Sequence, residues 1–413
     1  MRRPRVGVVG AGAGGLMAAR FAAAGGAEVT VFESTADGGR KILISGGGRC
    51  NVLPSVAMPE RYVTGSSPRA LRRILRSWPL AEQRAFFEDE LGIALRLEPE
   101  TGKLFPVSNR ARDVRDRLVA AAAEAGAELR FGVRVDGLRP PPGPGARWRI
   151  HLSGGETVAV DRVVVATGGL SVPKTGSDGA GLRWMEELGH RVHEPYPALT
   201  PLTGPDVHAE LAGVSLEVTV QAPGVRPRFS TRGGFLFTHR GYSGPTVLDA
   251  SHLTILSLRE GGRQELTVQW CDLDDDAWDR DLQEARSGVV GTRVAAHLPA
   301  RLARRLVHEA EVPWDRGVAR LTREERRRLV RCLASYALPW TGDEGYKKAE
   351  VTGGGVALDE VDLGSLESRR APGLFLCGEI LDAFGPIGGH NFLWAWATGR
   401  AAGRGAAAPL PTD

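Results

Sequence analysis

The stretch RVGVVGAGAGGLMAARFAAAGGAEVTVFE, residues 5–33, is the part of the sequence that most clearly predicts a fold. It opens with a β-branched run at 5–9, passes through GAGAGG, continues as an alanine-rich segment to about Ala24 and ends in the alternating pattern EVTVFE at 28–33. A strand, a glycine turn, a helix and a second strand in this order predict a β-α-β unit. The chain is therefore expected to contain a doubly wound α/β domain of the Rossmann type.

The glycines of this stretch have the spacing of a dinucleotide-binding turn, with Gly10, Gly12 and Gly15 forming GxGxxG. The first glycine permits a tight turn, the second lets the backbone approach a pyrophosphate, and the third allows the helix to pack closely on the strand. The start of the helix offers unpaired N–H groups to the phosphates. Glu33, at the end of the second strand, would accept hydrogen bonds from ribose hydroxyls and repel a 2′-phosphate.

Length and composition set the broad class of protein. A chain of 413 residues predicts two or three domains, and 42% hydrophobic residues are typical of a soluble globular protein. Its four cysteines show no CxxC pair, which favours a reducing, cytoplasmic location and argues against a metal site or a disulfide framework. No window reaches the roughly 20 apolar residues of a membrane helix, so no membrane partner is expected.

Basic residues are concentrated in two runs, 69–76 and 322–331, within a chain of net charge +4. Both runs are predicted to be helical, and the second mixes glutamates with its arginines. Solvated helix faces with local ion pairs are the favoured interpretation. No nucleic-acid-binding motif accompanies them, so no nucleic-acid partner is expected. The oligomeric state is left open.

Further elements follow from periodicity and turn residues. Helices are expected at 68–80, 80–91, 111–125 and 392–403, and strands at 128–135, 147–152 and 163–169. From about Tyr196 period-two strands separated by proline and glycine predict a β-rich insert, and from Asp275 helical periodicity dominates. After 346, short buried strands and glycine turns return.

Glycine-rich stretches at 46–48, 353–355 and 388–389 distinguish between possible cofactors. Only one complete fingerprint exists, which predicts one dedicated ADP-binding crevice. An isolated nicotinamide domain does not need three distant stretches of bare backbone. A flavin, with its ribityl chain and broad ring, does, and FAD is therefore the expected cofactor.

Several blocks carry a family resemblance: GAGAGGLMAA (10–19), GGRKILISGGGRCN (38–51), GKLFPVS (102–108), GGFLFTHRGYSGP (233–245), YKKAEVTGGGV (346–356) and GLFLCGEILDAFGPIGGHNFLWAWATG (373–399). They resemble the bacterial NAD(P)/FAD-dependent oxidoreductases, a flavoprotein family that includes aminoacetone oxidase and the flavoprotein implicated in bile-acid dehydroxylation. The resemblance implies a discontinuous FAD-binding domain from 1–195 and 346–413, a β-barrel-like insert at 196–274 and a helical subdomain at 275–345. The chain departs from the family pattern at His390, where a tyrosine is expected, and at Cys377.

The resemblance also implies roles around the flavin. Glu379 or Asp382 would bind the ribityl hydroxyls, and the start of the final helix would favour the negative charge that develops at N1 and O2 on reduction. Arg40 and Lys41 would meet phosphate. The full set of expected cofactor contacts is Gly10, Gly12, Ala13, Gly14, Gly15, Glu33, Ser34, Gly39, Arg40, Lys41, Ser45, Gly46, Gly47, Cys50, Asn51, Arg134, Val135, Ala166, Thr167, Gly168, Gly169, Gly378, Glu379, Asp382, Gly388, Gly389, His390, Asn391 and Phe392.

The candidates for catalysis are His390, Lys348, Cys50 and Tyr242, with Lys103, His239 and Lys347 as further candidates on the substrate side. Lysine stands out because the chain has only five, and burial can lower its pKa toward a catalytic range. Cys50 has two interpretations: a redox or covalent flavin partner, or a small residue packed behind the ring. No second cysteine lies nearby in sequence to resolve a disulfide.

The expected function is an FAD-dependent oxidoreductase that moves a hydride between flavin N5 and a small or medium organic substrate. Two versions stay open: an amine-type oxidase that uses oxygen, and a reductase that uses NAD(P)H as a transient donor. A non-catalytic flavin-binding redox sensor or an RNA-associated flavoprotein is the alternative from another class.

Overall fold

The computed structural model describes residues 2–143 and 145–410, which divide into two units: residues 2–196 with 350–410, and residues 197–349. Unit 1 is thus built from two separate stretches of chain, and unit 2 is the stretch between them. Each unit has its own buried hydrophobic cluster.

The centre of unit 1 is a five-stranded parallel sheet in the order β20-β10-β1-β2-β6. Its strands are β1 (Arg5–Val9), β2 (Glu28–Glu33), β6 (Glu128–Phe131), β10 (Arg162–Val165) and β20 (Leu374–Leu376). One of the two edge strands, β20, comes from the second stretch of chain and pairs with β10. This topology confirms the discontinuous Rossmann-type fold.

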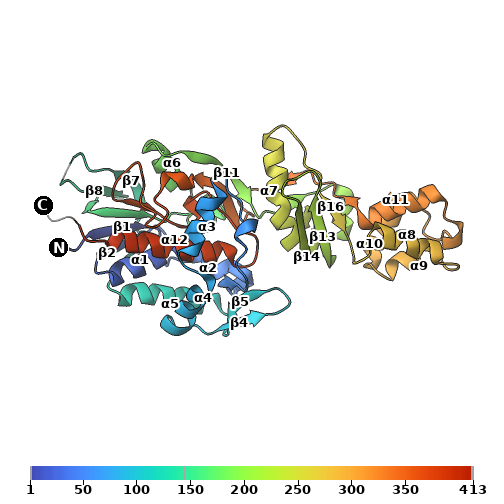
Figure 1. Cartoon of the computed structure of the whole chain (residues 1–413), viewed down its shortest axis with the longest axis horizontal. Helices are drawn as coiled ribbons and strands as arrows, with labels where there is room; N and C mark the ends of the chain where they lie inside the picture. Colours follow the sequence, from blue (N-terminus) through green and yellow to red (C-terminus); the bar gives the residue numbers. More distant parts are fainter. Residues whose placement is uncertain (1, 144, 411–413) are drawn as a thin grey trace. The chain divides into compact units, whose positions relative to one another are not determined.

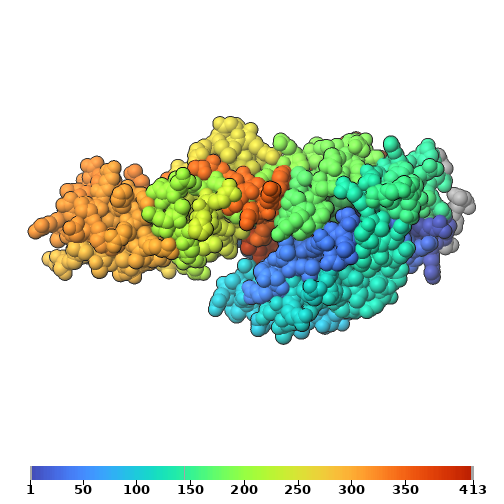
Figure 2. Space-filling view, turned by 180° about the vertical axis from the view of Figure 1, so that it is seen from behind, coloured from blue at the N-terminus to red at the C-terminus, as the bar shows by residue number. Residues whose placement is uncertain are grey.

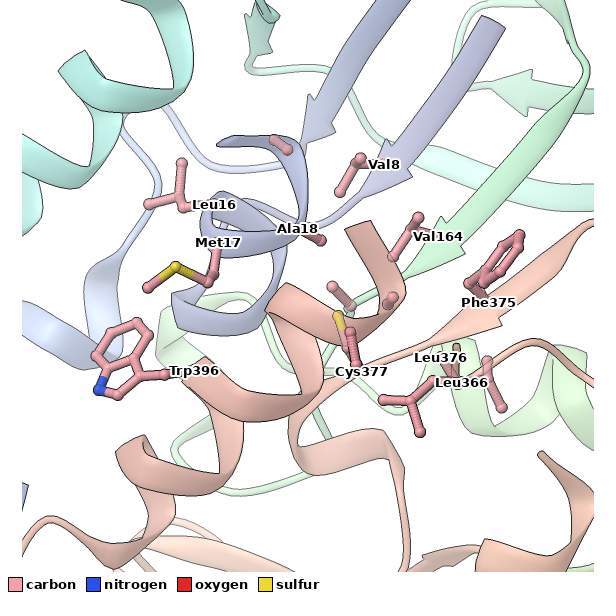
Figure 3. Close-up of a cluster of buried hydrophobic side chains, with 14 of the residues drawn as sticks. Val8, Leu16, Met17, Ala18, Val164, Leu366, Phe375, Leu376, Cys377 and Trp396 are labelled. Carbon is pink, nitrogen blue, oxygen red and sulfur yellow. The ribbon is translucent and has the colours of Figure 1, made fainter. Parts of the chain in front are cut away.

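Helices cover one face of this sheet. They are α1 (Ala13–Ala24), α5 (Ala111–Glu124) and α12 (His390–Ala407), and α1 packs along α12 (Figure 1). Small residues allow this close approach, because a Cβ on Gly399 would lie 2.5 Å from the Gly14 carbonyl oxygen and one on Gly403 would lie 2.4 Å from that of Ala18. Figure 3 shows buried side chains of this layer, among them Met17 of α1, Trp396 of α12, and Val8 and Val164 on the neighbouring strands.

The opposite face of the parallel sheet carries a three-stranded antiparallel sheet. It consists of β7 (Val135–Arg139), β8 (Trp148–Leu152) and β9 (Thr157–Val160). Gly7 makes the contact possible, because a Cβ there would meet Ile150 Cδ1 at 2.3 Å. The single strand expected at 128–135 is wrong in one respect: the chain breaks at Gly132, which has φ +71°, into β6 and β7.

The remaining elements of unit 1 position the candidate site. They are α2 (Arg40–Ile44), η1 (Ser45–Gly48), β3 (Leu53–Pro54), η2 (Pro59–Arg61), α3 (Pro68–Arg76), α4 (Leu80–Ala85), η3 (Phe86–Glu90), β4 (Leu95–Glu98), β5 (Lys103–Pro106), η4 (Pro173–Thr175), α6 (Ala180–Glu187), β11 (Val192–Ala198), β19 (Val351–Val356), η7 (Leu358–Glu360) and η8 (Gly378–Ile380). The expected helices in this region are confirmed, and the final helix is longer than expected at both ends.

Unit 2 contains a seven-stranded sheet in the order β17-β16-β13-β14-β15-β12-β18. Its elements are β12 (Leu202–Thr203), η5 (Asp206–Leu211), β13 (Ser215–Ala222), β14 (Phe229–Thr238), β15 (Gly241–Ser243), α7 (Pro245–Arg259), β16 (Thr267–Gln269), α8 (Asp275–Glu284), α9 (Val290–Ala295), α10 (Ala300–Glu309), η6 (Val318–Arg320), α11 (Arg323–Ala334), β17 (Tyr336–Ala337) and β18 (Gly342–Asp343). The 15-residue helix α7 lies inside the stretch expected to be rich in strands and was not predicted from the sequence. Proline at its first position begins this helix. None of the helices within residues 2–143 and 145–410 is long and apolar enough to cross a membrane.

Candidate functional site

The glycine turn after β1 has the geometry that a dinucleotide requires. Gly10 has φ +101°, which favours glycine, and a Cβ on Gly15 would lie 1.9 Å from the Gly10 carbonyl oxygen. A Cβ on Gly12 would meet nothing within 4 Å. Gly10 and Gly15 are therefore required by the fold itself, whereas Gly12 borders open space at the start of α1, where the pyrophosphate is expected.

Glu33 lies beside this turn at the end of β2. One carboxylate oxygen accepts a hydrogen bond from the Ala11 N–H at 2.8 Å, and the other accepts from the Thr35 N–H and hydroxyl, both at 2.7 Å. These bonds fasten the glycine turn to β2. They also hold the carboxylate at the position expected for recognition of the ribose hydroxyls.

The stretch RKILISGGGRCN folds as the short helix α2 followed by a turn of bare backbone. Gly46 and Gly47 adopt left-handed conformations, with φ +55° and +68°, and Gly48 has φ +86°. A Cβ on Gly47 would meet nothing within 4 Å, and one on Gly48 would meet a single atom at 3.9 Å. All three glycines thus satisfy a backbone requirement, and Gly47 and Gly48 also leave an open surface.

Lys41 and Glu379 join the two stretches of chain that form unit 1. The Lys41 ammonium lies 2.6 Å from the Glu379 carboxylate and donates to the Ser171 hydroxyl at 2.6 Å, and Ser171 donates to Glu379 at 2.6 Å. The Thr352 N–H also donates to Glu379, at 3.0 Å. Burial alone would raise the pKa of Glu379, but the Lys41 charge and these hydrogen bonds outweigh it and hold the pKa below 4.5. Lys41 therefore binds a carboxylate within the chain.

Ser171 and Thr352 were not singled out from the sequence. The Thr352 hydroxyl accepts from the N–H groups of Leu170 and Ser171, at 2.8 and 3.0 Å. Ser171 follows the buried strand β10 and Thr352 lies within the buried strand β19, each close to a run of glycines. A serine or threonine in such a position is not part of any motif with a defined spacing, so the sequence does not single it out.

Asp382 forms a second buried carboxylate site. It accepts hydrogen bonds from the hydroxyls of Thr64 and Ser66, at 2.9 and 2.8 Å, and lies 3.5 Å from His193 Nε2. Asp382 is 2% exposed, so these donors compensate its removal from water. Glu379 and Asp382, the two alternatives for binding the ribityl hydroxyls, thus occupy two separate hydrogen-bond networks.

The start of α12 packs against the segment that follows the three glycines. With its amide oriented to satisfy its hydrogen bonds, Asn51 accepts from the Gly389 N–H at 3.0 Å and donates to the Leu53 carbonyl at 3.1 Å. A Cβ on Gly389 would lie 2.6 Å from the Leu53 backbone, and one on Gly388 would meet the Lys103 side chain at 3.7 Å. The two glycine-rich blocks and Lys103 are therefore neighbours.

His390 occupies the first position of α12. It is 1% exposed, its ring packs edge-on against Tyr62 with centroids 5.8 Å apart, and its carbonyl accepts from the Tyr62 hydroxyl at 2.6 Å. Burial, and secondarily the charge of Arg61, lower its pKa to about 4. The imidazole is neutral at pH 7, and its buried Nδ1 has no hydrogen-bond partner among the described residues.

Cys50 is fully buried and has φ +61°, an uncommon conformation for a residue other than glycine. Burial raises the pKa of its thiol to about 12, although a hydrogen bond with Ser45 acts in the opposite direction. The thiol is therefore protonated at neutral pH. Of the two interpretations of Cys50, this environment favours packing over a reactive thiolate.

The other residues expected to contact the cofactor also lie in unit 1. Arg40 pairs with Asp37 at 2.9 Å, and Arg134 pairs with Asp178 at 2.9 Å. Figure 2 shows the blue surface of the chain after β2 beside teal and green surfaces of later segments of unit 1, in agreement with the contacts of Lys41 with Ser171 and of Arg115 with Asp37. The residues Ala13, Gly14, Ser34, Gly39, Ser45, Val135, Ala166, Thr167, Gly168, Gly169, Gly378, Asn391 and Phe392 also lie in unit 1, at strand ends, glycine turns or helix starts.

Four sequence candidates belong to unit 2. Lys347, Lys348 and His239 are exposed, and Lys348 precedes by four residues the Thr352 that binds Glu379. Tyr242 is fully buried and its hydroxyl lies 2.7 Å from His208 Nδ1. His208 Nε2 lies 2.9 Å from Glu309, which also accepts from the Tyr336 hydroxyl at 2.8 Å. This environment favours a structural role for Tyr242, and the catalytic assignments stay predictions.

The residues of unit 1 fit FAD. The open surfaces at Gly12 and Gly47, the unpartnered Nδ1 of His390 and the start of α12, which has no acidic residue in its first turn and no side-chain cap, all leave polar groups for a bound anion or ring. The distribution matches a cofactor with a phosphate end at α1 and a ring end at α12.

Comparison with known proteins supports the same assignment. The family model described as the HI0933-like protein Rossmann domain matches residues 4–405. The chain is 31% identical to a 3-dehydro-bile acid Δ(4,6)-reductase of Clostridium scindens over 412 residues, 98% of this chain and 99% of that protein. It is also 31% identical to a ribosomal RNA dihydrouridine synthase of Escherichia coli over 398 residues, 95% of each chain.

Solved structures show the fold. A 3-ketosteroid Δ1-dehydrogenase of Sterolibacterium denitrificans superimposes with a TM-score of 0.55 at 14% identity, over 98% of this chain and 99% of that one. A 3-ketosteroid-Δ4-(5α)-dehydrogenase of Rhodococcus jostii gives a TM-score of 0.52 at 15% identity, over 99% and 100% of the two chains. The resemblance drawn from the sequence blocks is confirmed: the chain belongs to the HI0933-like family and is an oxidoreductase with a Rossmann-type FAD-binding domain.

Proposed function

We propose that the protein reduces a carbon–carbon double bond conjugated to a carbonyl group, with FAD as hydride carrier and NAD(P)H as the electron source. One structural observation carries the proposal. The bare backbone of 46–48 and that of 388–389 are joined through the Asn51–Gly389 hydrogen bond of 3.0 Å. Two glycine-rich surfaces from opposite ends of the sequence thus meet where a flat ring is expected.

The reaction class comes from the relatives. The name of the bile-acid reductase describes reduction of the double bonds of a 3-oxo-4,6-diene, and dihydrouridine is uridine with its C5–C6 double bond reduced. In both substrates the double bonds are conjugated to a carbonyl group. At 31% identity to both proteins, the shared chemistry is a better supported proposal than either substrate.

The residues that would hold FAD lie along one path in unit 1. Gly12 and the first turn of α1 would bind the pyrophosphate, and Glu33 the adenosine ribose. Glu379 and Asp382 would anchor the ribityl chain, and the start of α12 would face the pyrimidine end of the ring. When bound, the cofactor accepts a hydride from NAD(P)H and donates one to the substrate.

Residues at the start of α12 would then control the charge around the bound ring. The partial positive charge at the start of α12 would stabilise negative charge near the ring, and no acidic residue in the first turn opposes it. Neutral His390 adds a polar group there without adding charge, because burial lowers its pKa to about 4.

The substrate gains a hydride at the β-carbon and a proton at the α-carbon. We assign the proton to Lys348, a lysine candidate that precedes Thr352 by four residues in the sequence. Lys348 is exposed, so solvent restores its proton.

The experiment is an anaerobic stopped-flow assay of the FAD-loaded protein. NADPH should bleach the flavin, and a 3-oxo-4-ene steroid or a uridine-containing RNA should restore its colour with a saturated product. Lys348→Met should slow the second step by about 100-fold or more and leave the first unchanged, whereas the matched variant Lys347→Met should alter neither. Bleaching by an amine with release of peroxide would establish an oxidase and overturn the proposal.

A further inference from the structure

The two basic runs of the sequence have different environments in the structure. On α11, Arg326 pairs with Asp279 at 2.7 Å, Arg328 approaches Glu324 at 3.7 Å, and Glu325 closes a capping box with Thr322. This run is the solvated helix face with local ion pairs that its sequence predicts.

The run on α3 is not compensated in this way. Its four arginines, Arg69, Arg72, Arg73 and Arg76, are all exposed, and the opposite face, with Ala70, Leu71, Ile74 and Leu75, is buried. Among residues 2–143 and 145–410, no acidic side chain pairs with any of the four guanidinium groups. We call these four residues the α3 arginine face.

Two acidic residues of a helix that packs against α3 are already neutralised. The short helix η7 packs against α3, but its Asp359 pairs with Arg191, and its Glu360 pairs with Arg370 at 2.7 Å. The positive charge of the α3 arginine face is therefore not cancelled by η7.

Further positive charge continues from the end of α3 onto α12, which α3 crosses in Figure 1. Arg400 donates to the Ser77 carbonyl at 2.9 Å and lies 4.9 Å from the centre of the Trp78 ring. Arg404 lies 5.5 Å from the centre of the Phe21 ring. Six guanidinium groups thus gather on two packed helices of unit 1.

The α3 arginine face is tied to the candidate site at its other end. Ser67 caps α3, and the preceding residue, Ser66, donates to Asp382 at 2.8 Å and accepts from the Leu358 N–H at 3.0 Å. A polyanion on α3 would therefore lie next to the loop that holds Asp382.

We propose that the α3 arginine face binds the phosphate backbone of an RNA substrate and so presents one of its bases to the flavin. The inference rests on the proposed function, because a uracil base carries the conjugated double bond that this reaction needs. Arginine suits the task, since its planar fork binds phosphate oxygens in pairs and it stays charged at all relevant pH values. From the sequence alone no nucleic-acid partner is expected, and the proposed RNA substrate replaces that expectation.

The test measures the binding of a fluorescein-labelled oligouridylate to the FAD-loaded full chain. The oligouridylate has about 20 nucleotides, which is longer than the roughly 4–16 nucleotides that one single-strand-binding domain covers. In the face variant, Arg69, Arg72, Arg73 and Arg76 are changed to Gln. In the matched control variant, the exposed and unpaired Arg96, Arg112, Arg139 and Arg149 of unit 1 are changed to Gln, which removes the same charge. Flavin content and thermal unfolding verify that both variants are folded.

The face variant should bind the oligouridylate at least about tenfold more weakly, and its plot of log affinity against log salt should be flatter by about 3, because each lost phosphate contact on a single strand removes about 0.7. The control variant should bind within about twofold of the wild type. Equal loss in both variants, or no loss in the face variant, would overturn the inference. So would equal, α3-dependent binding of phosphatidylglycerol vesicles, which would indicate a membrane surface instead.

Failure of this inference is separable from failure of the proposed function. If both variants reduce a 3-oxo-4-ene steroid and RNA binding does not depend on α3, the RNA-binding inference is wrong and the reductase function stands. If RNA binds through α3 but no conjugated double bond is reduced, the reductase function is wrong and the RNA-binding surface stands.

Discussion

The Lys41 ammonium and the Glu379 carboxylate lie 2.6 Å apart although 338 residues separate them in the sequence. Lys41 belongs to α2, next to the three glycines, and Glu379 belongs to η8, which follows the last strand of the parallel sheet. With Ser171 and Thr352 they form one network from four separate segments. This network holds the two stretches of unit 1 together at the place where the flavin is expected.

Breaking this pair should be costly. Lys41→Met and Glu379→Gln should each lower the free energy of unfolding by about 2 kcal/mol, because each leaves a partly buried charge or its donors without a partner. The double variant should lose less than the sum, with a coupling energy of about 1 kcal/mol or more. Urea unfolding of the four proteins measures this, and strictly additive losses would mean that the pair is not coupled.

The same pair predicts how stability depends on pH. The folded-state pKa of Glu379 is held below 4.5, so the unfolded chain binds the proton more readily. The stabilisation is therefore fully present above about pH 4.5 and is lost as pH falls through the lowered folded pKa. The stability difference between the wild type and Glu379→Gln should shrink on titration from pH 7 toward pH 3, and a difference that grows in acid would contradict this assignment.

Gly12 and Gly15 should respond differently to substitution. Gly15→Val should prevent stable folding of unit 1, because a Cβ there would lie 1.9 Å from a backbone oxygen. Gly12→Val should leave the apoprotein within about 0.5 kcal/mol of the wild type and abolish FAD binding, since its side chain would enter open space at the helix start. Thermal unfolding of the apoproteins and flavin fluorescence measure the two effects, and FAD binding by Gly12→Val would remove the pyrophosphate from this turn.

Cys50 should be dispensable for turnover. Its buried thiol has a pKa of about 12, so iodoacetamide at pH 8 should not modify it in the folded protein. Cys50→Ala should keep FAD and reduce substrate within about twofold of the wild-type rate. Loss of turnover with FAD still bound would restore a redox or covalent role for this cysteine.

Tyr242 and Tyr336 form a matched pair for testing the role of the buried network in unit 2. Each phenol group meets the His208–Glu309 pair, so each change to Phe should cost about 1–3 kcal/mol of stability. Turnover should stay the same in both variants. A selective fall in turnover in Tyr242→Phe, at equal stability, would establish Tyr242 as the catalytic group that the sequence suggested.

The sequence predicted the sheet strands β1 and β2 and the glycine turn between them because their patterns are local. Hydrophobic alternation and glycine spacing act within about ten residues, and the φ of +101° at Gly10 follows from them. Helix α7 was missed because it comes directly after strands of period two and has no charged face that would distinguish it from them. Proline at its start indicates a turn as readily as a helix.

The candidate site was predictable only in part. Glu379, Asp382 and the glycine blocks have spacing and resemblance signals, whereas Ser171, Thr352, Thr64 and Ser66 gain their roles from long-range packing. The contact of Lys41 with Glu379 was not predicted either, since a lysine beside glycines suggests phosphate and only the fold brings this carboxylate to it. Both basic runs are predicted to be solvated helix faces with local ion pairs, and only the second, which carries its own glutamates, has that environment.

The most direct test of the central claim is the reoxidation half-reaction. FAD-loaded protein is reduced with one equivalent of NADPH without oxygen and mixed with a 3-oxo-4-ene steroid or a uridine-containing RNA. The proposed reductase function predicts that the flavin colour returns at a rate that depends on substrate concentration and that the product is saturated at the conjugated double bond. A flavin that NADPH does not reduce, or that only oxygen reoxidises, would contradict it.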